Sequence, residues 1–151
     1  MSENLKPLEK IEKIKITTQT ILSLPESFSF PNGWTQRELL IHLWSWDDQF
    51  LEFCLAKKSA RKKFQYAHEE EKLPYDKWND IIIEKFEDMP FDEALELFET
   101  TRSELIRSFE KYAKLMSKKE NAGKYDDIDK VMDVWQHDKL HLESGGIVPY
   151  L

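Results

Sequence analysis

The sequence predicts an all-α protein, a four-helix bundle formed by residues 1–151 as a single domain. Apolar residues recur at intervals of three and four over long stretches, which is the spacing of one buried helix face. The 4 glycines are few, and the 6 prolines fall between these stretches rather than inside them. No stretch of useful length alternates apolar and polar residues as a half-buried strand does. A chain of 151 residues has the size of one domain and can bury a core without disulfides or a structural metal.

The first helix is predicted over residues 7–24. Its apolar stripe consists of Leu8, Ile11, Ile14 or Ile16, Thr18, Ile21 and Leu22. Pro25, Pro31 and the pair Asn32-Gly33 then indicate a connection, because proline interrupts helices and Asn-Gly favours a turn.

The second helix has the clearest start in the chain. Thr35 and Glu38 form the pattern of a capping box, in which the hydroxyl accepts a backbone N–H and the glutamate reaches back to the cap. The helix is predicted to continue toward Lys57. Its apolar pattern comprises Leu39, Leu40, His42, Leu43, Trp46, Phe50 and Phe53. Residues 58–74 are predicted to form a polar excursion.

The middle of the chain predicts a short helix over residues 77–88 and a third long helix over residues 92–115. The dipeptide Met89-Pro90 separates the two, because a proline ends the preceding helix. Residues 118–123 are predicted to be a turn.

The last helix is predicted to begin near Asp126 or Asp127, because carboxylates favour a helix N-terminus. It ends at Gly145-Gly146, a common C-terminal signal. Its pattern runs through Ile128, Val131, Val134, His137 and His141.

Composition excludes several classes of partner. The net charge of −7 argues against nucleic acid, whose binding requires a basic face that neutralises phosphates. No apolar run approaches the roughly 18 residues of a membrane span, and the N-terminal segment with Ser2 and Glu3 lacks the apolar core of a signal peptide. The lone Cys54, which lies on a helical pattern, indicates a buried structural thiol and a reducing compartment. We therefore expect a cytoplasmic protein.

Three of the four histidines lie where they could share a metal ion. His137 and His141 are four residues apart, so on a helix their imidazoles lie on one side about one turn apart. His42 shares its side of another long helix with Leu39, Trp46, Phe50 and Phe53, and therefore points toward the interior, where facing helices build metal sites.

Residue spacing alone leaves other interpretations open. A lone histidine on an apolar helix face, such as His42, is more often a hydrogen-bonded core residue. His137 and His141 fit a solvated pair, because the apolar arc of the last helix is centred well over 90° away from them. A metal at this position would lie at the edge of the core, in an open cleft. His68, beside three glutamates, is predicted to be a surface residue with no part in metal binding.

Two parts of the chain resemble the DinB superfamily. The order of one early histidine and a late spaced pair is the most specific part of this resemblance. The matching segments are Gly33-Trp34-Thr35, residues 38–43 with Trp46 and Asp47, and His137-Asp138 with His141 and Ile147. Residues 75–79 and 89–94 are similar to the DfsB/ClbS branch, small bundles tied to self-protection against reactive natural products. Together the similarities cover most of residues 33–147.

The resemblance implies a DinB-like four-helix bundle, often dimeric, with a divalent metal held by His42, His137 and His141. Zinc or nickel is the expected ion. Superfamily members include metal-dependent thiol transferases and mycothiol-dependent isomerases, and many others have no assigned reaction. Some DfsB/ClbS-type proteins lack the full histidine set, so the two similarities imply somewhat different chemistry.

The predicted function is metal-assisted thiol transfer or hydrolysis acting on a reactive small molecule, with a small-molecule substrate or thiol as partner. No Ser-His-Asp pattern, glycine-rich phosphate loop or Cys-x-x-Cys offers another source of reactivity. Asp47, Asp138 or Glu143 could orient an imidazole; no residue is assigned as a general base. Two other classes stay open. One is sequestration of a small molecule in a pocket lined by Trp44, Trp46, Trp78 and Trp135; the other is a non-catalytic interaction protein stabilised by the metal.

Overall fold

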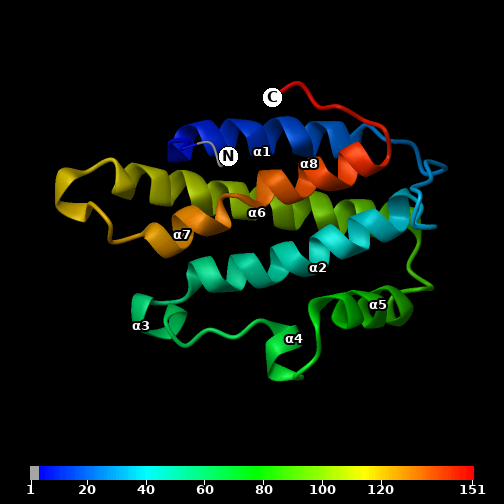
Figure 1. The fold of residues 1–151 in the computed structure, drawn as a ribbon, viewed down its shortest axis with the longest axis horizontal. Coiled ribbons are helices and arrows are strands. Elements are labelled where there is room, and N and C mark those ends of the chain that lie inside the picture. Colours follow the sequence, from blue (N-terminus) through cyan, green and yellow to red (C-terminus); the bar gives the residue numbers. More distant parts are fainter. Residues whose placement is uncertain (1–3) are drawn as a thin grey trace. The chain divides into compact units, whose positions relative to one another are not determined.

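The computed structural model describes residues 4–151, so Ser2 and Glu3 of the N-terminal segment lie outside the described part. Within residues 4–151 the regular structure is helical, with no strand and one isolated antiparallel bridge, between Ser29 and Thr35. The prediction of an all-α chain is confirmed (Figure 1). No helix of this part of the chain combines the length and the apolar composition that crossing a membrane requires.

The chain divides into two compact units, one formed by residues up to 24 together with 104–151, the other by residues 25–103. Helix α6 (Phe91–Met116) contributes its first half to residues 25–103 and its second half to the other unit. The four-helix bundle and the single domain remain predictions.

The unit that contains both ends of the chain is built around α1 and α8, which pack side by side (Figure 1). Its elements are α1 (Pro7–Leu22), the end of α6, η1 (Lys119–Asn121), α7 (Asp126–Val131) and α8 (Val134–Ser144). The sequence left open whether Ile14 or Ile16 belongs to the apolar stripe of the first helix. Ile14 does, because it is fully buried, whereas Ile16 is exposed. Ile11 and Ile21 are buried on the same face.

The last helix is not continuous, which corrects the prediction of one helix from Asp126 or Asp127 to Gly145. In a regular helix the Asp133 N–H would donate to the Asp129 carbonyl. Here the Lys10 ammonium donates to that carbonyl at 3.1 Å, and the Asp133 N–H donates to the Lys130 carbonyl instead, also at 3.1 Å. Lys10 also pairs with the Asp133 carboxylate at 2.9 Å. A buried lysine from α1 therefore divides the helix into α7 and α8.

The unit of residues 25–103 places α5 against α2 and α4 against α5 (Figure 1). Its elements are α2 (Gln36–Leu55), α3 (Lys58–Arg61), α4 (Ala67–Glu70), α5 (Tyr75–Lys85) and the start of α6. The Arg37 guanidinium donates to the carbonyls of Phe86 and Met89 at 2.9 and 3.2 Å and so fixes the end of α5 to α2. Cys54 is buried, as predicted.

The start of α2 has the predicted capping box. Thr35 and Glu38 form both of its contacts, and the Thr35 backbone N–H donates to the Glu38 carboxylate at 3.3 Å. The preceding turn needs glycine at position 33, because its φ of +90° is strained for other residues. The predicted connection at Asn32-Gly33 is confirmed.

The polar excursion predicted for residues 58–74 contains two one-turn helices and packs through aromatic rings. Tyr66 lies 5.9 Å from Trp46 between ring centroids, and His68 lies 5.5 Å from the same indole. Burial, then the charges of Cys54 and Glu69, raises the pKa of Tyr66 to about 12. His68 is half-buried among these rings, so the prediction of a plain surface residue is wrong. His68 is partly buried because it packs against aromatic rings. The adjacent glutamates made the segment look like a solvated loop in the sequence.

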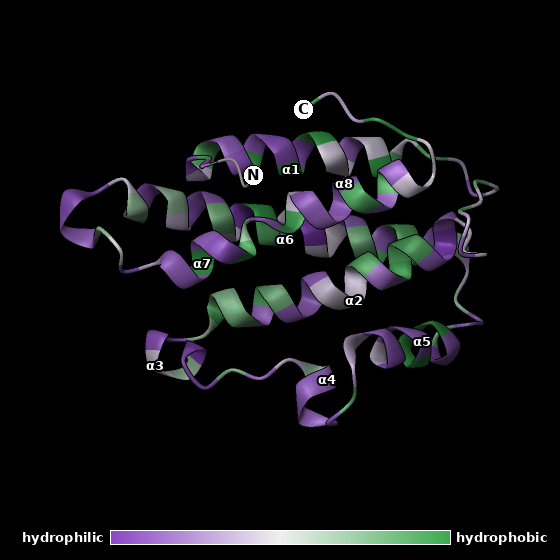
Figure 2. Ribbon diagram, in the orientation of Figure 1, coloured by the Kyte–Doolittle hydropathy of each residue, from purple (hydrophilic) through white to green (hydrophobic). Residues whose placement is uncertain are grey.

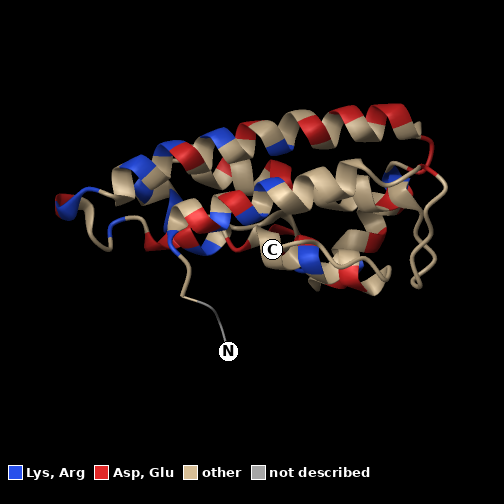
Figure 3. Ribbon diagram, turned by 90° about the horizontal axis from the view of Figure 1, so that it is seen from above, with Lys and Arg blue, Asp and Glu red and all other residues tan. Residues whose placement is uncertain are grey.

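Hydrophobic residues recur among hydrophilic ones along α1, α2 and α6, as amphipathic helices require (Figure 2). Helix α6 carries Asp92 and Glu93 in its first turn and Lys114 in its last (Figure 3). This order stabilises the helix, because it complements the positive N-terminal and negative C-terminal ends of the helix dipole.

Candidate metal centre

His137 and His141 lie one turn apart on α8, with their side chains half-buried. Their Nε2 atoms are 3.0 Å apart, and the ring planes cross at 84°. Two nitrogens bound to one tetrahedral zinc at about 2.0–2.1 Å lie about 3.3 Å apart. The 3.0 Å contact is a hydrogen bond between the two imidazoles, and its length is close to the spacing that a shared ion needs.

The protonation state of His141 also suits metal binding. Burial, then the charge of His137, lowers the pKa of His141 to about 4, while Asp138 acts in the opposite direction. At neutral pH the His141 imidazole is therefore uncharged and keeps the lone pair that a metal requires.

The same pKa predicts an acid-sensitive fold in metal-free protein. The unfolded chain takes up the His141 proton near pH 6.5, whereas the folded chain does so only near pH 4, so stability falls as the pH drops through this interval. After allowance for partial exposure, we expect His141 to account for about 1–2 kcal/mol of the loss. Urea unfolding with a chelator present, at pH 7 and pH 4.5, measures it.

The control for this measurement is His141→Gln, which cannot titrate and leaves the carboxylates of the chain unchanged. Its free energy of unfolding should fall less than that of the wild type between the two pH values. An equal fall in both proteins would show that His141 does not contribute.

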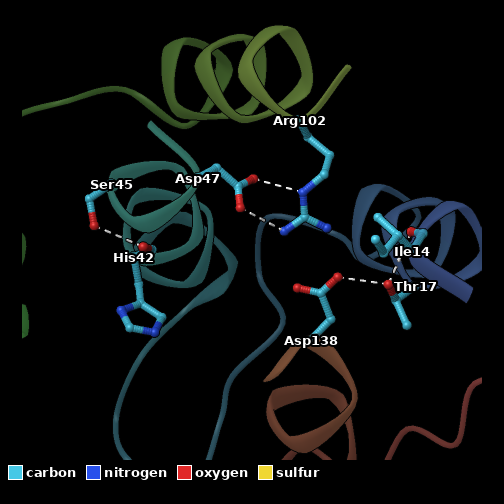
Figure 4. Close-up of polar contacts among 7 residues, drawn as sticks. All are labelled: Ile14, Thr17, His42, Ser45, Asp47, Arg102 and Asp138. Atoms are coloured by element: carbon cyan, nitrogen blue, oxygen red, sulfur yellow. Dashed lines mark hydrogen bonds and ion pairs between the residues drawn. The ribbon is translucent and has the colours of Figure 1, made fainter. Parts of the chain in front are cut away.

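Asp138, between the two histidines, anchors α8 to α1. It is fully buried and accepts a hydrogen bond from the Thr17 hydroxyl at 2.7 Å (Figure 4). The contact fixes the rotation of α8 about its axis, which keeps His137 and His141 on the partly exposed side of that helix. The charge of Asp138 acts on His141 against burial, because a nearby negative charge favours the protonated imidazole and raises its pKa.

His42 lies on α2 and is buried, with only 3 % of its surface exposed. The prediction that it points to the interior is confirmed. Its imidazole packs against the indole of Trp34, with ring centroids 5.0 Å apart and planes tilted by 51°. The Ser45 hydroxyl donates to the backbone carbonyl of His42 at 2.8 Å (Figure 4).

The three predicted ligands lie close enough to hold one metal ion. His42, His137 and His141 each offer one ring nitrogen, and these atoms lie within 4.8 Å of one another. Three imidazoles are a ligand set of catalytic zinc sites, in which a further coordination position stays open.

A buried ion pair lies one to two turns beyond His42 on α2. Asp47 receives two hydrogen bonds from Arg102 of α6, 2.7 Å from Nε and 3.1 Å from Nη2 (Figure 4). Both side chains are at most 1 % exposed. Of the other carboxylates considered for orienting an imidazole, Glu143 is exposed and pairs with Lys139 at 3.9 Å.

The sequence analysis missed Arg102, although a signal was present. Its spacing from Phe98, Leu105 and Phe109 places it on the apolar stripe of α6. A basic residue on such a stripe indicates a buried acidic partner. Asp47 is an acidic residue on the apolar side of α2, so the sequence already offered it as that partner.

Three of the four tryptophans of the sequestration hypothesis, Trp44, Trp46 and Trp135, make different contacts. Trp44 contacts Phe86 with ring centroids 5.3 Å apart, and Trp46 donates to Asn79 at 2.7 Å. Trp135 is buried beneath Lys13. An open depression on α2 includes none of them. It is lined by Asp48, Leu51, Glu52, Leu55 and Ala56.

The description of the fold and of the histidine cluster rests on this chain alone. No family model, curated protein or solved structure matches this chain.

Proposed function

We propose that the chain binds one divalent metal ion, zinc or nickel, through His42, His137 and His141 and uses it to act on a reactive, electrophilic small molecule. The reaction is thiol transfer or hydrolysis, as the resemblance to the DinB superfamily implies. The observation that carries the proposal is the convergence of three imidazole nitrogens within 4.8 Å of one another. The neutral state of His141 at physiological pH supports it further.

A divalent ion in such a site lowers the pKa of a bound thiol or water and so supplies a nucleophile at neutral pH. The imidazoles of His42, His137 and His141 would hold the ion. His42 is buried, whereas His137 and His141 are partly exposed, so the pair on α8 would be the part of the ligand set that small molecules reach. Asp138 and Thr17 fix the helix that presents the pair.

The test is a panel of thiols and electrophiles incubated with metal-loaded protein. We expect turnover by the wild type and a loss of about 100-fold or more in His42→Ala, because even outer partners of metal ligands are worth about 10–100-fold. His68→Ala is the matched control, since His68 also packs against an indole and is not part of the cluster. Product formation is measured by chromatography.

Two other outcomes would replace the proposal. Equal background rates in wild type and His42→Ala, with tight binding of the compounds by the wild type, would establish sequestration of the DfsB/ClbS type. Neither turnover nor binding would favour an interaction protein, and chelation should then lower the melting temperature strongly, because the metal would be holding the fold together.

A homodimer is a further part of the proposal and rests on the family resemblance. Light scattering at high protein concentration should give twice the mass of the 18.1 kDa chain. A monomeric mass would remove the dimer without affecting the metal site.

A further inference from the structure

The exposed charges of α6 are segregated along the helix, with one sign in each half (Figure 3). The exposed charged residues of the first half are all acidic: Asp92, Glu93, Glu96, Glu99 and Glu104. Those of the second half are all basic: Arg107, Lys111 and Lys114. We call these eight residues the α6 charge stripe. The half-buried Glu110 is not part of it, because it pairs with Lys15 of α1 at 3.7 Å.

Contacts within the chain do not account for this order. Within residues 4–151, none of the eight side chains of the α6 charge stripe forms an ion pair. Glu96 and Glu99 repel each other instead, because like charges three positions apart lie on neighbouring turns of a helix. Lys111 and Lys114 have the same spacing and also repel each other. An arrangement that served only this helix would mix the two signs.

The helix dipole accounts for only part of the stripe. It favours acidic residues in the first turn and basic residues in the last turn, and its effect falls off beyond those turns. Asp92, Glu93 and Lys114 lie within the first and last turns of α6. Glu99, Glu104 and Arg107 lie in the middle of the helix, so their order has another cause. Their charges are available to a partner outside the chain.

A second copy of the same helix has the complementary order of charges when it runs antiparallel to the first. A two-fold axis sets residue i of one copy against residue j of the other, and j against i. The register that sets Glu96 level with Lys114 of the second copy also sets Glu99 level with its Lys111. The 26 residues of α6 form one continuous helix about 39 Å long, so the helix itself fixes this spacing.

We propose that two copies of this chain pair through the α6 charge stripe, antiparallel about a two-fold axis, with the acidic half of each stripe against the basic half of the other. The inference rests on the homodimer of the proposed function and names its interface. Exposed ion pairs each contribute little free energy, so these charges set the orientation of the two copies and make the dimer sensitive to salt.

The test reverses each half of the stripe in a separate protein and measures the mass by sedimentation equilibrium. The lysine variant carries Glu96→Lys and Glu99→Lys, and the glutamate variant carries Lys111→Glu and Lys114→Glu. We expect the wild type to form a dimer of the 18.1 kDa chain at low salt and a weaker one at about 0.5 M salt. Each variant should self-associate about 10-fold more weakly or less. An equimolar mixture of the two should dimerise, because opposite charges then face each other along the stripe.

The matched control carries Asp48→Lys and Glu52→Lys on α2, where both residues are exposed and form no ion pair with another residue of the described chain. The lysine variant and this control each replace two negative charges by two positive ones, which changes the net charge from −7 to −3. Repulsion between whole molecules therefore falls equally in both, and net charge alone would strengthen both dimers. We expect the control to dimerise at least as strongly as the wild type and the lysine variant to dimerise more weakly.

The outcomes separate the interface from the rest of the proposed function. A lysine variant that dimerises as strongly as the wild type, or a mixture that stays monomeric while the wild type dimerises, would overturn this interface and leave the homodimer in place. A monomeric wild type would overturn both, whereas zinc stoichiometry on the same protein reports on the metal site separately. If a reversed variant loses its helical circular dichroism, the neutral variant Glu96→Gln with Glu99→Gln decides, since a dimer as strong as that of the wild type contradicts charge pairing.

Discussion

Replacing Arg102 by methionine should lower the free energy of unfolding by about 3–5 kcal/mol, because removing one partner leaves the other charge buried without its counterion. The guanidinium is fully buried and donates two hydrogen bonds to the Asp47 carboxylate, at 2.7 and 3.1 Å. Methionine preserves much of the volume, so the loss reports on charge rather than on a cavity. Urea unfolding followed by circular dichroism measures it.

Arg107→Met provides the control on the same helix. Arg107 is exposed, and its replacement should change stability by no more than about 0.5 kcal/mol. A cost for Arg102→Met as small as that of the control would show that the Asp47 pair does not stabilise the fold.

Replacing His42 by alanine should weaken zinc binding by about 100-fold or more, since the ion loses one of three imidazole ligands and water replaces it poorly. His42 is the buried member of the cluster. The affinity is measured by competition with a chromophoric chelator.

His68→Ala is expected to leave zinc affinity within about twofold, because His68 lies in the aromatic cluster with Trp46 and not among the three ligands. The two substitutions remove the same side chain from beside a tryptophan. Equal losses in both variants would mean that the effect is structural rather than a loss of coordination.

Helix positions follow from the sequence because their signals are local. Prolines, the Asn32-Gly33 turn and the capping box at Thr35 act within a few residues, and the ends of α1, α2 and α6 lie within about two residues of the predictions. The division between α7 and α8 could not be predicted in this way. It depends on a hydrogen bond from Lys10 to the Asp129 carbonyl, 119 positions away in the chain.

The excursion at residues 58–74 shows a similar limit. Its charged composition indicates a solvated loop, yet Phe64, Tyr66 and His68 pack with rings of α2. Isolated aromatic residues among lysines and glutamates carry no periodic pattern, so only the folded chain shows which surface they cover.

The histidines of the candidate site could be chosen from the sequence, because the spacing of His137 and His141 and the helical phase of His42 are both local properties. The groups around them could not. Trp34 reaches His42 only through the turn that precedes α2, and Arg102 reaches Asp47 from another helix. Such contacts depend on the packing of elements.

The central claim, that His42, His137 and His141 hold one metal ion, is tested most directly by metal analysis of protein purified without a histidine tag. Wild type and the double variant His137→Ala, His141→Ala are dialysed against the same zinc solution and then against metal-free buffer. The account predicts one zinc per chain in the wild type and a residual amount in the double variant. Stoichiometric zinc retained by the double variant, or a wild type that retains none, would contradict it.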